Sequence, residues 1–149
     1  MRNKVNEIKI SYCEKIPRKL RYKVNCSQDI AKFLYDHWDK KTIGLKETFK
    51  VVLLNNSNRV KGICEISSGG ITGTIVDLRI LFAVVLKSLT VGIILAHNHP
   101  SGNLKPSNSD KLLTDKIIQG AKVLDVNVLD HIILGPDGDY FSFADKGFL

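Results

Sequence analysis

An apolar segment at residues 91–96 runs directly into His97 and His99, and this junction constrains the fold more than any other feature of the chain. A short apolar run that ends in polar residues is typical of a buried strand. Side chains two residues apart on an extended backbone lie on the same side, so both imidazoles would face one small volume. The sequence therefore predicts a buried strand that carries two imidazoles at its exit.

A carboxylate follows at a distance that lets it join these histidines. The ten residues between His99 and Asp110 are rich in Pro, Gly, Asn and Ser, so they form a loop that can turn back toward the strand end. Two neutral imidazoles and one carboxylate suit a divalent metal, zinc above all, and three protein ligands leave a fourth position for water. The residues alone thus indicate a metal site made of His97, His99 and Asp110.

The same residues also have interpretations that need no metal. Two histidines at a strand end can simply be loop histidines. Ser107 and Asp110 have the spacing of a capping box, with Ser107 as the N-cap and Asp110 at the third position of a helix. The two interpretations compete for Asp110, because a carboxylate bound to a metal would not be free to accept from the N-cap amide. The coincidence of all three donor types favours the metal site.

Length and composition fit a single domain with a real core, since the chain has 149 residues of which 44% are hydrophobic. We expect a cytoplasmic location, because the N-terminus leads into no apolar signal segment. The longest apolar run, residues 80–86, is too short to span a bilayer, so no membrane partner is expected. Cys13, Cys26 and Cys64 are odd in number and form no C-x-x-C pair, which favours reduced thiols.

Positive charge gathers in the first third of the chain. Residues 1–50 carry thirteen Lys or Arg and six Asp or Glu, whereas residues 51–149 carry nine of each. Eight of the basic residues lie within residues 1–23, so we expect a basic arm over 1–24 ahead of a domain over 25–149. The arm could approach nucleic acid or an acidic protein surface, and it fits a solvated extension equally well.

Helical and extended patterns alternate along the domain. Helices are expected at 27–39, 78–88 and 107–124, and strands at 47–54, 59–67, 91–96, 127–134 and 140–143. Helices that alternate with strands, together with two hairpins, predict an α/β fold with a mixed β-sheet flanked by helices.

Hydrolysis at such a metal needs a general base that reaches the bound water without being a ligand. Glu47 and Glu65 are the glutamates that follow residue 14, and both lie on the strands of the expected hairpin. The residues alone leave the choice between them open.

The spacing of these groups resembles the JAMM family of metalloproteases, also called MPN or JAB domains. The family's signature is an upstream glutamate followed by H-x-H, seven residues, Ser, two residues and Asp, and the stretch from His97 to Asp110 matches it without a gap. Further short matches resemble the RadC-like branch of the family: His-Asn-His-Pro-Ser-Gly at 97–102, Pro106-Ser107, Asp130-His131-Ile132-Ile133 and Ser142-Phe143. The resemblance covers residues 27–149.

This resemblance implies a function as well as a fold. It implies His97, His99 and Asp110 as ligands of Zn²⁺, Ser107 as a hydroxyl that stabilises the oxyanion, and Glu47 as the catalytic acid and base. The fold would be the JAB/MPN, cytidine-deaminase-like fold, and the activity a zinc-dependent hydrolysis of peptide or isopeptide bonds in a peptide or protein substrate. His131 would be a core histidine or a support for the ligands, since as a zinc ligand it is surplus.

Two other functions remain open. One is a metal-dependent nuclease, although imidazoles suit zinc better than the oxygen-loving metals that nucleases commonly use. The other is a DNA-associated, repair-related binding module that would use the basic arm, residues 1–23. Longer RadC-like proteins carry a helix-hairpin-helix module in that place, which weakens a direct transfer of DNA binding. The substrate and the oligomeric state do not follow from the sequence.

Overall fold

The computed structural model describes residues 4–70 and 74–149, so residues 1–3 of the expected arm lie outside it. All eight expected elements are present, and one short 3-10 turn, η1, was not expected. In chain order the elements are η1 (Arg18–Leu20), α1 (Ser27–Asp36), β1 (Thr48–Leu54), β2 (Val60–Ser68), α2 (Leu78–Lys87), β3 (Gly92–Asn98), α3 (Asn108–Val123), β4 (Asn127–Leu134) and β5 (Tyr140–Ser142).

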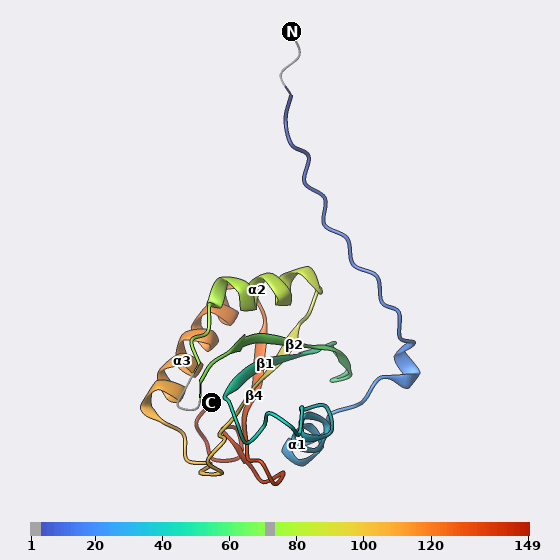
Figure 1. Ribbon diagram of the computed structural model, residues 1–149. Coiled ribbons are helices and arrows are strands. Elements are labelled where there is room, and N and C mark those ends of the chain that lie inside the picture. Colours follow the sequence, from blue (N-terminus) through green and yellow to red (C-terminus); the bar gives the residue numbers. More distant parts are fainter. Residues whose placement is uncertain (1–3, 71–73) are drawn as a thin grey trace.

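The strands form one mixed sheet in the order β2-β1-β3-β4-β5 (Figure 1). Strand β1 is antiparallel to both of its neighbours, β2 and β3. Strands β3 and β4 are parallel and are connected through α3, while β4 and β5 form an antiparallel hairpin. The mixed sheet flanked by helices that the sequence predicts is confirmed.

Helices cover both faces of the sheet, with α1 on one face and α2 and α3 on the other (Figure 1). Side chains along β1 alternate between the two: Val52 and Leu54 pack toward α1, whereas Val51 and Leu53 pack toward α2 and α3. Because both faces of the central strands are buried, these strands appear in the sequence as continuous apolar runs.

Helix α1 ends at Asp36, three residues before the expected end. The carboxylate of Asp39 accepts the backbone N–H of Lys41 at 2.9 Å, and this local bond begins a separate turn. Asp side chains compete with helical hydrogen bonding in this way. Trp38 nevertheless reaches the core with 4% of its surface exposed, which explains why its spacing fitted the helix.

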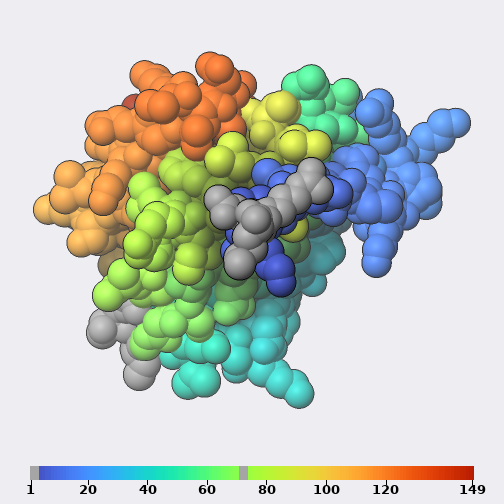
Figure 2. Space-filling view, turned by 90° about the horizontal axis from the view of Figure 1, so that it is seen from above, coloured from blue at the N-terminus to red at the C-terminus, as the bar shows by residue number. Residues whose placement is uncertain are grey.

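On the N-terminal side of η1 the arm leaves the domain in an extended conformation (Figure 1). In the view from above, the dark blue arm points toward the viewer, and the lighter blue residues around η1 lie at the side opposite the orange α3 (Figure 2). Its base is anchored, because Val60 donates to the carbonyl of Tyr22 at 2.9 Å and the buried Arg21 donates to the carbonyl of Ile16. The end of the arm therefore packs as part of the domain.

Two further expectations concern membranes and thiols. None of the helices in residues 4–70 and 74–149 is both long enough and apolar enough to cross a membrane. Cys13, Cys26 and Cys64 are all free thiols.

Candidate metal centre

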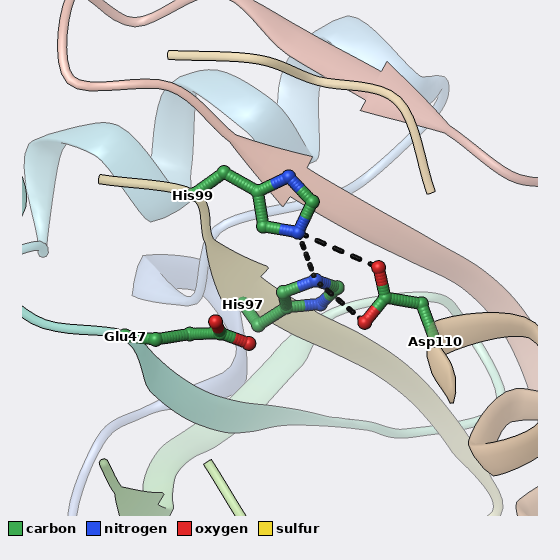
Figure 3. A group of neighbouring side chains, drawn as sticks. All are labelled: Glu47, His97, His99 and Asp110. Carbon is green, nitrogen blue, oxygen red and sulfur yellow. Dashed lines mark hydrogen bonds and ion pairs between the residues drawn. The ribbon is translucent and has the colours of Figure 1, made fainter. Parts of the chain in front are cut away.

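Four of the five predicted site residues meet at one end of the sheet. One ligand atom from each of Glu47, His97, His99 and Asp110 lies within 4.8 Å of those of the other three (Figure 3). Glu47 directly precedes β1, His97 lies near the end of β3, His99 follows that strand, and Asp110 lies in the first turn of α3. Segments far apart in the chain thus supply one group of side chains.

Strand register explains why Glu47, rather than Glu65, belongs to this group. In the antiparallel pair of β1 and β3, Phe49 lies opposite His97, and the same register continued by two residues brings Glu47 beside His99. Glu65 lies on β2 and pairs with Lys50 of β1, the residue after Phe49. The side chain of Glu65 therefore lies on the opposite face of the sheet from Phe49, the face covered by α1, and it is exposed. The alternation of strand side chains therefore separates the two glutamates.

The two imidazoles and the carboxylate converge closely. Nε2 of His97 lies 3.0 Å from Nε2 of His99, and each of these nitrogens lies 3.4 Å from one oxygen of Asp110. Nδ1 of His99 lies 2.6 Å from the carbonyl oxygen of Asn103, which can only accept. A neutral His99 therefore carries its proton on Nδ1 and directs the lone pair of Nε2 into the group. Such a set of lone pairs fits a cation, so the residues suit a bound metal.

Asp110 caps the start of α3 and faces both histidines at the same time. The backbone N–H of Ser107 donates to Oδ2 of Asp110 at 2.7 Å, and the backbone N–H of Asp110 donates to Oγ of Ser107 at 3.0 Å. The capping box is therefore complete while the same carboxylate faces both histidines. A carboxylate has two oxygens and several lone pairs, so the capping box leaves lone pairs of Asp110 for a metal.

The pKa of Asp110 lies well below its ordinary value. Burial raises this pKa, but the neighbouring imidazoles of His97 and His99 and the amide of Ser107 outweigh that effect. The carboxylate is therefore ionised over the whole physiological pH range, so it carries the negative charge that suits a ligand of a metal cation.

Ser107 lies beside the group as the N-cap of α3 and is exposed. Its Oγ accepts the N–H of Asp110, so its own hydroxyl proton is not used in the capping box. The capping box therefore leaves that proton free to be donated elsewhere.

Glu47 is half-buried, and its carboxylate extends toward the histidines (Figure 3). Burial raises the pKa of this carboxyl, and the nearby histidines reduce the effect. Within the described residues, no hydrogen bond or ion pair joins Glu47 to His97, His99 or Asp110. A carboxyl with a raised pKa that stands apart from the ligand set is suited to proton transfer.

Asn98 supports the site in a way that the sequence did not reveal. It is buried between the two histidines, and its amide bonds to the segment that carries Glu47, with Thr48 as donor and Ile43 and Lys46 as acceptors. The signal in the sequence was a polar amide at the end of an apolar strand. That signal indicates a buried amide, but it does not indicate which groups the amide bonds to.

His131 lies behind the group and contacts a ligand candidate, in agreement with its expected role as a core or supporting residue. Its Nε2 is 2.8 Å from Nδ1 of His97, and its ring stacks on Phe143 with centroids 4.6 Å apart. Complete burial lowers the pKa of His131 well below its ordinary value, so the ring stays neutral. Neighbouring Asp130 accepts the N–H of Ala144 and so holds the segment that contains Phe143.

A family model described as a RadC-like JAB domain matches residues 24–148. The chain belongs to this family. The RadC-like JAB domain is 50% identical over 101 residues to a UPF0758 protein of Flavobacterium johnsoniae, which covers 68% of this chain and 44% of the relative. It is 35% identical over 127 residues to a UPF0758 protein of Clostridioides difficile, with 85% of this chain and 52% of the relative covered.

A third relative is a UPF0758 protein of Methanosarcina mazei, 34% identical over 127 residues that cover 85% of this chain and 54% of the relative. The chain thus spans about half the length of the curated relatives it matches. These matches confirm the family and the JAB/MPN type of fold for the RadC-like domain.

Proposed function

We propose that this domain is a zinc-dependent hydrolase of peptide or isopeptide bonds, with His97, His99 and Asp110 as the zinc ligands. The observation that carries the proposal is the convergence of two imidazole lone pairs and an ionised carboxylate beside Glu47. Two imidazoles and one carboxylate are a donor set of catalytic zinc, in which the fourth position belongs to water or substrate.

Zinc at this position would lower the pKa of a bound water toward neutrality and polarise the carbonyl of the substrate. Glu47 accepts a proton from the attacking water and later donates it to the leaving amine as the C–N bond breaks. The raised pKa of Glu47 helps it to hold that proton between the two steps. The hydroxyl of Ser107 donates to the carbonyl oxygen as negative charge develops there.

The decisive experiment compares Glu47→Gln with Glu65→Gln, a matched change at the other glutamate of the hairpin. Both proteins are loaded with zinc and assayed on a pool of quenched fluorescent peptides and on a peptide with a lysine isopeptide bond. We expect Glu47→Gln to keep its zinc in elemental analysis and to lose at least about 100-fold in turnover. Glu65→Gln should keep both properties.

Three outcomes would contradict the proposal. Unchanged turnover in Glu47→Gln removes Glu47 as the base. Zinc that stays bound in His99→Ala removes the ligand assignment. A zinc-loaded wild-type protein that cleaves neither probe removes peptide and isopeptide hydrolysis as the activity.

A second candidate function is binding of nucleic acid through the arm. Arg21 is buried and paired with Glu14, but the other basic side chains of the described arm are exposed: Lys4, Lys9, Lys15, Arg18, Lys19 and Lys23. Binding to duplex DNA should then weaken steeply with salt, and each Lys→Gln substitution that removes a phosphate-binding charge should reduce the slope by about 0.9. Binding without salt dependence would contradict this proposal, and magnesium or manganese at the metal site would favour a nuclease.

A further inference from the structure

A chain of three short contacts connects the backbone of Asp110 to the ring of His97. The carbonyl oxygen of Asp110 lies 2.7 Å from Oγ1 of Thr114, and that oxygen lies 2.6 Å from Nδ1 of His131. Nε2 of His131 lies 2.8 Å from Nδ1 of His97. Thr114, His131 and His97 are all buried, so water does not compete for these bonds.

The direction of the first two bonds follows from counting protons. A carbonyl oxygen has no proton, so the proton between Thr114 and Asp110 must come from the hydroxyl of Thr114. A hydroxyl has only one proton. The proton in the next bond must therefore come from Nδ1 of His131. The opposite direction would leave two oxygens 2.7 Å apart with no proton between them.

The same argument fixes the third bond. His131 is fully buried, and its ring nitrogens contact only Thr114 and His97 among the described residues, so no carboxylate stabilises a charged ring. A neutral imidazole has one N–H, and in His131 that N–H is on Nδ1. Its Nε2 can therefore only accept, and the proton between the rings belongs to Nδ1 of His97.

We infer that Thr114 and His131 are positioning residues that hold His97 in the tautomer protonated on Nδ1, so that its Nε2 lone pair faces the metal position. Packing keeps the ring of His131 from turning, because it stacks on Phe143 and meets the edge of Phe49. The bonds start at the backbone of one proposed ligand and end at the ring of another. The inference rests on the proposed function for its purpose, but the tautomer is a property of the metal-free protein.

The tautomer is measurable without metal and without substrate. In metal-free wild-type protein with ¹⁵N-labelled histidine at about pH 8, above the ordinary pKa of an imidazole, long-range ¹H–¹⁵N spectra report which ring nitrogen carries the proton. We expect the proton on Nδ1 in both His97 and His131. A proton on Nε2 of either ring would overturn the inference and would leave the proposed hydrolase standing.

Variants of Thr114 test the first residue in this series of hydrogen bonds without altering a proposed metal ligand. Thr114→Val keeps the shape but removes the hydroxyl, Thr114→Ser keeps the hydroxyl, and Thr90→Val makes the same change at a buried threonine bonded to Ser88. We expect Thr114→Val to give mixed tautomers at His97 and to weaken zinc binding about 10-fold or more against a chromophoric chelator. Thr114→Ser and Thr90→Val should behave as wild type. Zinc binding of wild-type strength in Thr114→Val, or equal weakening in Thr90→Val, would overturn the role of Thr114.

Discussion

The side-chain oxygen of Asn98 accepts the backbone N–H of Thr48 at 2.8 Å, and this bond holds the residue that directly follows Glu47. The amide nitrogen of Asn98 donates to the carbonyls of Ile43 at 2.7 Å and Lys46 at 2.8 Å. One buried side chain therefore fastens the segment on both sides of the proposed base. The central residue of the His-Asn-His motif positions the segment of Glu47, while the histidines on either side of it are the proposed metal ligands.

Asn98→Ala should lower the free energy of unfolding by about 3 kcal/mol, because three bonds of about 1 kcal/mol each are lost and buried backbone groups are left unpaired. Urea unfolding measures this change. Asn108→Ala is the matched control, since Asn108 is exposed at the start of α3; we expect less than about 0.5 kcal/mol there. Equal effects in the two variants would show that the amide of Asn98 does not fasten this segment.

Substitutions at Ser107 separate its cap from its proposed role with substrate. Ser107→Ala removes both and should lower the free energy of unfolding by about 1 kcal/mol, whereas Ser107→Gly should lower it by only a few tenths. Both variants lack the hydroxyl, so both should lose about 100-fold in turnover. Ser107→Thr should keep the cap and the turnover. If turnover instead follows stability across the three variants, Ser107 acts only as a cap.

Acid should destabilise the metal-free protein through His131. Burial holds the pKa of His131 well below 6.5 in the folded state, so below pH 6.5 the unfolded chain binds a proton that the folded chain does not. Stability from this residue is therefore present above pH 6.5 and falls with acidification, by at most about 1.4 kcal/mol per pH unit.

The comparison with His131→Gln isolates this contribution in urea unfolding from pH 7.5 to pH 5. His99 has a raised pKa and acts in the opposite direction, because hydrogen bonding to Asp110 favours its charged form in the folded state. That effect is common to both proteins. The advantage of wild type over His131→Gln should shrink as the pH falls, and a constant difference would mean that His131 titrates normally when folded.

Zinc should stabilise the folded protein, and this effect should grow with the logarithm of the free zinc concentration above the dissociation constant. At a free zinc concentration 100 times the dissociation constant, the free energy of unfolding should rise by about 2.7 kcal/mol. Thermal unfolding with zinc and with excess chelator measures this rise. His99→Ala should abolish it, whereas His37→Ala, at an exposed histidine after α1, should leave it unchanged. A zinc-induced rise that persists in His99→Ala would place the metal elsewhere.

Much of the fold follows from local patterns in the sequence. Strand β4 begins and ends at the expected residues because its apolar run is sharply bounded, and α3 begins after Ser107 because the capping box is a local signal. The end of α1 was misplaced, because the bond from Asp39 to Lys41 competes with a helical pattern that continues to Trp38.

The contacts of the site depend on register between strands, which periodicity does not encode. Nothing local distinguishes Glu47 from Glu65, since the face of each is set by how β1 pairs with β2 and β3. The contact between His97 and His131 likewise depends on the pairing of β3 with β4, where the register shifts between Ile93 and Ile94. The spacing of the motif indicated the ligand candidates, but the contacts of Asn98 and His131 that position them follow only from the three-dimensional structure.

The strand order has a consequence for how the protein is made. Strand β3 carries the histidines at the centre of the sheet, between β1, which is synthesised earlier, and β4, which is synthesised later. While the ribosome is still adding β4, neither His131 nor the Phe143 that stacks on it is available to brace His97. The proposed ligands are therefore synthesised before the residues that brace His97, and the nascent chain has no complete site until β5 has been added.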